Sequence, residues 1–89
     1  MSLKIEKDIQ SKYFNAVAEG RKTFEIRRDS ILYNVGEHLV LREIENGAYT
    51  GDFVEAEITY VLRDVPEYGL KPGYCILGIK VIGYVRGIR

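Results

Sequence analysis

The densest group of chemically active side chains in this sequence lies in residues 21–28 (RKTFEIRR), which combine four cations, a carboxylate and a hydroxyl. Arginine and lysine in such a group bind phosphate or carboxylate, and a neighbouring carboxylate orders them or accepts hydrogen bonds from a nucleobase. The candidate ligand-binding residues are Lys22, Thr23, Glu25 and Arg27. The alternative is a solvated strand face, on which each surface ion pair contributes no more than about 1 kcal/mol. The spacing alone favours this alternative, because a Thr-x-Glu-x-Arg alternation is common.

A helix is expected immediately before this group. Its apolar residues recur at intervals of three and four, as on one face of an α-helix: Ile9, Tyr13, Phe14 and Val17. Asp8 is suited to cap the N-terminus with its carboxylate, and Gly20 is suited to end the helix because glycine adopts the left-handed conformation freely. These patterns predict a helix over residues 9–19.

Beyond this helix the hydrophobic period changes to two, which is typical of a strand. Along residues 23–28 the side chains should alternate between two faces, one with Phe24 and Ile26 and the other with Thr23, Glu25 and Arg27. Since the strand begins where the helix ends, we expect Lys22 and Glu25 to lie within ion-pairing distance. The hollow that holds them should be lined by the helix end and residues 63–73.

The remaining segments predict four more strands. These are expected at residues 3–5, 38–44, 53–62 and 74–85, with an Asn-Gly turn at residues 45–47 and loops at residues 29–36 and 63–73. One helix among short, mostly antiparallel strands is an α+β arrangement. Closing the sheet into a small β-barrel removes exposed edges, and Gly78 and Gly83 would permit the bends. We therefore predict a single domain over residues 1–89, a barrel of mixed strands with one principal helix near the N-terminus.

Composition and charge restrict the function. The 89 residues carry 13 basic and 13 acidic side chains, and zero net charge argues against tight non-specific binding of nucleic acid. Residues 29–68 hold nine acidic and two basic side chains, so the basic excess lies at both ends, which would form a basic face if they meet in space. No apolar run is long enough to span a membrane, and residues 1–8 lack a signal-peptide core. A cytoplasmic location is expected.

Other reactive residue types carry weaker signals. His38 has no cysteine or acidic neighbour at ligand spacing, so neither a metal nor a cofactor is expected. Cys75 lies in an apolar segment and is expected to be an inert core thiol. Four tyrosines lie in or beside loops, where each could stack a base or simply pack its ring on the core: Tyr33, Tyr49, Tyr68 and Tyr74. Tyr68 is favoured for stacking because it lies in the long loop beside Gly69.

Residues 20–27 resemble the G-x-K-T-x-E-x-R signature of ASCH domains. Similar residues continue in the same order along nearly the whole chain, at residues 13–17, 35–37, 41–43, 49–51, 58–61 and 69–77. The pattern is similar to that of a small, single-domain, uncharacterised ASCH subgroup of bacteria and phages. The resemblance implies a PUA-like β-barrel with a cleft under the helix, and a role in binding RNA or a nucleotide.

Several positions depart from the ASCH pattern. The subgroup usually has a histidine just before a Leu-Lys pair, where this chain has Met1 or Ser2, and whether residues 1–3 are native is left open. Its loop after the signature usually reads Asn-Asp-Arg, of which this chain keeps only Asp29. Another ASCH branch hydrolyses acetylated cytidine with a lysine, a threonine and a glutamate. Its lysine matches Lys22, its threonine falls on Glu25, and its glutamate has no counterpart that we can place.

These observations favour a binding module for RNA or a nucleotide-like ligand over an enzyme. Lys22 and Arg27 would hold phosphate, Glu25 would accept hydrogen bonds or order the cations, and Tyr68 would stack a base. The first alternative is a hydrolase acting on a modified nucleoside, with a desolvated Lys22 as the base and Glu25 as a proton shuttle. The second is a protein-interaction adaptor without a ligand site. The identity of the ligand and the oligomeric state stay open, because a shared fold does not fix function.

Overall fold

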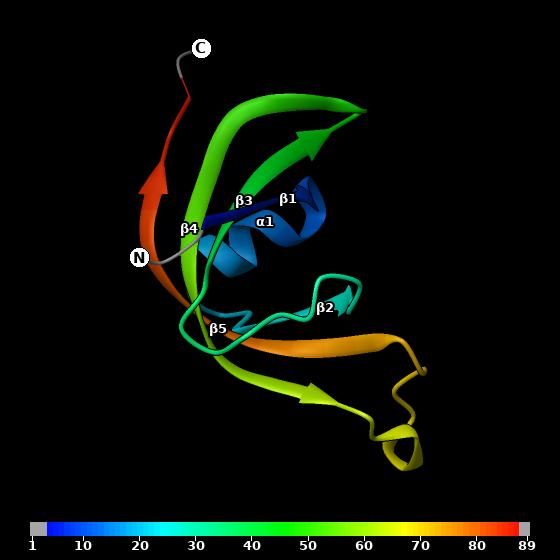
Figure 1. Cartoon of the computed structure of the whole chain (residues 1–89). Coiled ribbons are helices and arrows are strands. Elements are labelled where there is room, and N and C mark those ends of the chain that lie inside the picture. The colour runs from blue at the N-terminus through cyan, green and yellow to red at the C-terminus, as the bar shows by residue number, and fades with distance from the viewer. Residues whose placement is uncertain (1–3, 88–89) are drawn as a thin grey trace.

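The computed structural model describes residues 4–87 and folds them into one α-helix and one five-stranded sheet (Figure 1). In chain order the elements are β1 (Lys4–Gln10), α1 (Ser11–Ala18), β2 (Phe24–Arg28), β3 (His38–Glu45), β4 (Ala48–Arg63), the 3-10 helix η1 (Pro66–Tyr68) and β5 (Tyr74–Val85). The α+β class with one helix near the N-terminus is therefore confirmed. Leu3, in the first expected strand, lies outside the described residues. In the described part, no helix is long and apolar enough to cross a membrane.

The strands form a curled sheet in the order β1-β3-β4-β5-β2. β1 pairs with β3 in parallel, and all other pairs are antiparallel. The predicted barrel is confirmed only in this coarser form, because β1 and β2 are the two edges of the sheet and the curl leaves a half-barrel. Figure 1 shows α1 on the inner side of this curve, where it packs against β1, β3 and β5.

Two bulges bend the long strands, and each borders one of the glycines predicted to permit a bend. The register between β4 and β5 shifts after the Glu55–Gly83 pair and again before the Tyr60–Gly78 pair. Both bulges strengthen the local twist, as expected for a bulged antiparallel pair. The curl of β4 and β5 that brings the edges β1 and β2 toward each other follows from these bends.

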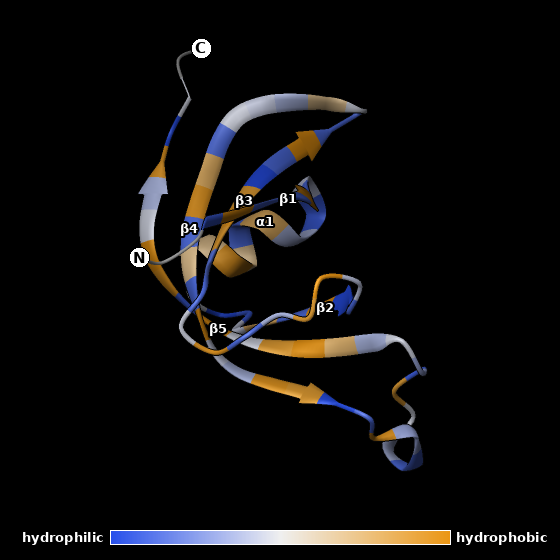
Figure 2. Ribbon diagram, in the orientation of Figure 1, coloured by the Kyte–Doolittle hydropathy of each residue, from blue (hydrophilic) through white to orange (hydrophobic). Residues whose placement is uncertain are grey.

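The hydrophobic core lies between α1 and the inner face of the sheet. The helix contributes Phe14 and Val17, and the loop after β2 contributes Tyr33. Strand residues complete the cluster: Ile9, Leu39, Leu41, Val54, Ala56, Ile58, Cys75, Leu77 and Ile79. Burial alternates along β3 and along the middle of β4, because every second side chain of a strand points to the core. Figure 2 shows hydrophobic stretches between hydrophilic ones in both strands.

The helix is shorter than predicted, and its cap is different. It begins at Ser11 rather than Ile9, and β1 continues to Gln10, whose side chain makes no capping hydrogen bond. The prediction that Asp8 caps the helix is wrong, because residues 4–10 pair in register with β3 and Ile9 is buried as a strand residue. The end is as predicted: Gly20 has φ 77°, and its amide bonds to the Val17 carbonyl.

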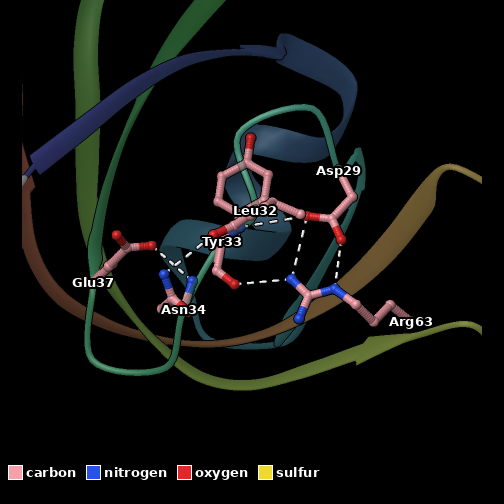
Figure 3. Close-up of polar contacts among 6 residues, drawn as sticks. All are labelled: Asp29, Leu32, Tyr33, Asn34, Glu37 and Arg63. Carbon is pink, nitrogen blue, oxygen red and sulfur yellow. Dashed lines mark hydrogen bonds and ion pairs between the residues drawn. The ribbon is translucent and has the colours of Figure 1, made fainter.

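The loop between β2 and β3 is tied to the end of β4 by an ion pair (Figure 3). The Asp29 carboxylate accepts hydrogen bonds from the Arg63 guanidinium and from the Tyr33 amide at 3.3 Å. Arg63 Nη2 also donates to the Tyr33 carbonyl at 2.9 Å. The Tyr33 ring is thereby fixed in the core, so this tyrosine is not available to stack a base.

Candidate functional site

The polar face of β2 points into the molecule and its apolar face points out. The predicted alternation is present, but Glu25 and Arg27 are the inward residues, whereas Phe24 and Ile26 are exposed. The Glu25 side chain is only 7% exposed. The alternative of a solvated polar face is therefore wrong. The reason is that β2 is an edge strand whose inner side meets the start of α1 and the end of β1, and this seam holds polar groups.

Glu25 holds two cations, one on each carboxylate oxygen. Lys22 Nζ lies 3.0 Å from Oε1, and Arg27 Nη2 lies 3.1 Å from Oε2. The cationic side chains are 18% and 21% exposed, so all three groups are largely withdrawn from water. The expectation that Lys22 and Glu25 form an ion pair is confirmed. One carboxylate between two cations leaves this trio with one net positive charge.

Arg27 also joins the two edges of the sheet. Its Nη2 donates to the backbone carbonyl of Asp8 in β1 at 2.9 Å, so a side chain bridges the seam that no strand pairing closes. Arg27 Nε is buried and has no hydrogen-bond partner. Leaving a buried donor without a partner costs about 1–3 kcal/mol.

Two aromatic rings flank the trio. Lys22 Nζ lies 4.7 Å from the centroid of the Phe24 ring and 5.5 Å from that of Tyr13, which belongs to the first turns of α1. A hollow of about 350 Å³ opens here, lined by Tyr13, Lys22, Phe24, Glu25 and Ile26. A smaller hollow of about 210 Å³ adjoins it and shares Tyr13, Glu25 and Ile26, with Arg27 and the end of β1 on its other side. We call the two hollows together the Glu25 cleft. Its volume is that of a small ligand site.

The structure separates two predicted residues from this cleft. Thr23 precedes β2 and lines a different hollow near the end of α1, and its carbonyl accepts from the Ile79 amide at 3.0 Å. Tyr68 lies on η1, is 82% exposed and lines neither part of the cleft. The expected lining by residues 63–73 is absent from the cleft. That loop instead lines a separate hollow, with Ile26 and Tyr74.

Sequence reasoning missed Tyr13 and Phe24 as site residues. Tyr13 was assigned to the helix stripe that packs on the core, yet its ring is exposed at the edge of that stripe. Phe24 was assigned to the apolar face of β2 without a decision on which face is buried. No local signal decides between the two faces, because charged side chains ordinarily point outward. Only once Glu25 is known to point inward must Phe24 lie on the surface beside Lys22.

Outside the cleft, two titrating groups are explained by their surroundings. The hydrogen bond from Arg63 holds the pKa of Asp29 below its ordinary value of 3.8. Burial raises the pKa of Cys75 to about 11, so the thiol stays protonated at neutral pH, as expected for an inert core cysteine.

His38 Nδ1 lies 2.7 Å from Glu55 Oε2. Among residues 4–87, no three His, Cys, Asp or Glu side chains are grouped so as to hold a metal ion.

Comparison with known proteins assigns a family. The family described as "Domain of unknown function (DUF3850)" matches residues 2–79, which include the Glu25 cleft. The chain belongs to the DUF3850 family. This DUF3850 chain is also 43% identical over 56 residues to a protein of Escherichia phage P2 named "Uncharacterized 12.9 kDa protein in GpA 3'region". The match covers 63% of the chain and 51% of the phage protein, so the chain spans about half the length of this relative.

Proposed function

We propose that this DUF3850 chain binds single-stranded RNA or a nucleotide-like ligand, with a base held in the Glu25 cleft. The observation that carries the proposal is the Lys22–Glu25–Arg27 trio at the floor of a hollow flanked by the rings of Tyr13 and Phe24. Aromatic faces stack bases of any sequence, and cations near them add affinity. A hollow with the ion pair inside it also favours a ligand site over an open, flat adaptor surface.

The chemistry of the floor suits a base better than a phosphate. The trio carries one net positive charge, but its carboxylate lies between the two cations, where it would repel a phosphate. A floor that combines the Glu25 carboxylate acceptor with the N–H donors of Lys22 and Arg27 matches the donor and acceptor pattern of a nucleobase edge. Phosphate would then be held at the rim, where the Lys12 ammonium lies 5.0 Å from the centroid of the Tyr13 ring.

The ASCH resemblance supports the same proposal. It implies a PUA-like domain with a cleft under the helix, and a curled mixed sheet with a hollow beside α1 is compatible with that expectation. We propose that the DUF3850 chain is a PUA-like domain of this kind. Because a fold does not fix function, the binding proposal depends on the residues of the cleft and not on the resemblance.

Hydrolysis of a modified nucleoside is less well supported. A catalytic base must have a lone pair free to accept a proton. Lys22 Nζ instead donates to Glu25 at 3.0 Å and to the Phe24 carbonyl at 2.8 Å, and it faces two aromatic rings as a cation does. These contacts use Lys22 Nζ as a hydrogen-bond donor and not as an acceptor. Release of acetate from acetylated cytidine by the purified protein would overturn this preference.

The test is titration of a fluorescently labelled RNA octamer, followed by anisotropy at two salt concentrations. Tyr13→Leu keeps an apolar side chain but removes the stacking face, so affinity should fall by about 5- to 150-fold, equivalent to about 1–3 kcal/mol, with an unchanged salt dependence. Lys12→Ala should lower the logarithmic salt slope by about 0.7. Tyr49→Leu, on an exposed ring of β4 that lies over Arg42, is the matched control.

The outcomes separate the proposals. Equal binding by the Tyr13→Leu and Tyr49→Leu variants would place the RNA elsewhere and refute the cleft. Failure of the wild-type protein to bind any RNA, together with recovery of a protein partner, would favour the adaptor. The stacking role of Tyr68 stays a prediction, and the same assay on Tyr68→Leu checks it: a loss like that of Tyr13→Leu would support it.

A further inference from the structure

We propose that the bound RNA extends beyond the Glu25 cleft along the outer face of β2 and stacks a second base on Tyr74. This inference rests on the proposed function and adds a second contact site to it. The ligand is then an oligonucleotide rather than a free nucleotide. This path is supported by the strand register, by cations without carboxylate partners and by a second hollow.

Strand register places the side chains of this path in one row. Phe24, Ile26 and Arg28 alternate with the inward residues of β2, so all three lie on its outer face. In the antiparallel ladder with β5, Ile26 is opposite Ile76 and Arg28 is opposite Tyr74. Residues directly opposite each other project from the same face of a sheet. The outer face therefore runs from the Glu25 cleft at Phe24 to Tyr74.

A second hollow lies at the far end of this row. It has a volume of about 250 Å³ and is lined by Ile26, Gly69, Leu70, Lys71 and Tyr74. Ile26 also lines the Glu25 cleft, so the two hollows meet at this side chain. From Phe24 to Arg28 the strand advances by about 13 Å, which corresponds to about four stacked nucleotides or fewer extended ones.

The second hollow repeats the chemistry of the first. Arg28 Cζ lies 5.6 Å and Lys71 Nζ 5.7 Å from the centroid of the Tyr74 ring, as Lys12 and Lys22 lie near Tyr13. Within residues 4–87, no salt bridge joins Lys12, Arg28 or Lys71 to a carboxylate. Their charges stay available to an anion.

Arg42 and Tyr49 form a contrasting pair, in which carboxylates already occupy both the cation and the tyrosine hydroxyl. Arg42 lies over the Tyr49 ring at 4.8 Å, but it also pairs with Glu6, and the Tyr49 hydroxyl donates to Asp8 at 2.8 Å. Rings beside cations that no carboxylate neutralises suit a strand of bases and phosphates. An acidic peptide would use the cations but would leave the row of rings without a matching partner.

The experiment compares probes of different length on the same variants. Calorimetric titration of wild-type protein with uridine 5′-monophosphate, tetrauridylate and octauridylate should show affinity rising up to four nucleotides and then levelling off. Tyr74→Leu should weaken octauridylate binding by about 5- to 150-fold and leave the mononucleotide unchanged. Tyr13→Leu should weaken all three probes.

A second variant guards against a folding defect in Tyr74→Leu. Lys71 is exposed in the loop before β5, and Lys71→Ala should lower the logarithmic salt slope for octauridylate by about 0.7. Lys80 is also exposed but lies off the path, so Lys80→Ala should leave this slope unchanged. If Tyr74→Leu and Lys71→Ala bind octauridylate like wild type while Tyr13→Leu does not, the path to Tyr74 is refuted and the cleft survives. If wild-type protein binds none of the probes, the cleft and the path are both refuted.

Discussion

Glu25→Gln removes one negative charge from the floor of the cleft and preserves the shape of the side chain. In the native protein each carboxylate oxygen accepts from a different cation, Lys22 at 3.0 Å and Arg27 at 3.1 Å. Glutamine keeps one oxygen acceptor and replaces the other with an N–H donor. One cation therefore loses its acceptor and faces a second donor in a site that is largely withdrawn from water.

The size of the effect follows from burial. Removing one partner of a buried ion pair lowers the free energy of unfolding by about 3–5 kcal/mol. The low end applies here, because the cations keep about a fifth of their exposure and glutamine retains one acceptor. For a domain of this size, each 1 kcal/mol shifts Tm by about 4–8 °C, so a loss of about 3 kcal/mol lowers Tm by about 12–24 °C.

Urea and thermal unfolding followed by circular dichroism measure this loss, with an unchanged denaturant m-value as the sign of two-state behaviour. Glu19→Gln is the matched control, because Glu19 forms an exposed pair with Arg21, and such pairs contribute about 0–1 kcal/mol. High salt should abolish the loss of stability in Glu19→Gln, because that pair is exposed, and should leave most of the loss in Glu25→Gln. Equal, small losses for both variants would show that the trio is solvated and would refute the buried floor.

Two further predictions concern groups outside the cleft. Because Arg63 lowers the pKa of Asp29 below 3.8 in the folded protein, ionised Asp29 stabilises the fold above that value, and the contribution is lost as the pH falls through the lower folded-state pKa. Asp29→Asn should thus have a lower free energy of unfolding than wild type in urea at pH 7, and this difference should shrink in strong acid. A difference that does not change with pH would contradict the linkage. Burial and a pKa of about 11 should make Cys75 react slowly with a thiol reagent at pH 8 and rapidly after unfolding, and fast labelling of the native protein would argue against a core thiol.

The strands were predictable wherever the pattern was local. Residues 74–85 carry a long apolar run, and β5 has these bounds. β4 begins at Ala48 rather than Phe53, because the Asn46–Gly47 turn, with both φ angles positive, continues the hairpin directly from β3. The length of β1 was underestimated, because its parallel pairing with β3 is a long-range contact. Ile9 fits both a helical stripe and a strand alternation, and only the pairing decides between them.

The candidate site was predictable in its charged residues and not in its surroundings. Lys22, Glu25 and Arg27 lie within six residues of one another, so a turn and a short strand fix their separation. Which face of β2 points inward depends on the curl of the whole sheet, and this hid the roles of Tyr13 and Phe24. The unpartnered Arg27 Nε also follows from tertiary packing and has no signature in the sequence.

The incomplete barrel accounts for the position of the cleft. Backbone hydrogen bonds between β1 and β2 would have closed the sheet and satisfied both edges without side chains. Instead the seam is bridged by Arg27. Its Nη2 atom donates to the Asp8 carbonyl and also pairs with the Glu25 carboxylate. A guanidinium that spans a gap needs a buried carboxylate to hold it, and that carboxylate in turn draws Lys22 toward the two rings. The polar floor and the aromatic walls are therefore consequences of one structural feature, the unpaired edge of β2.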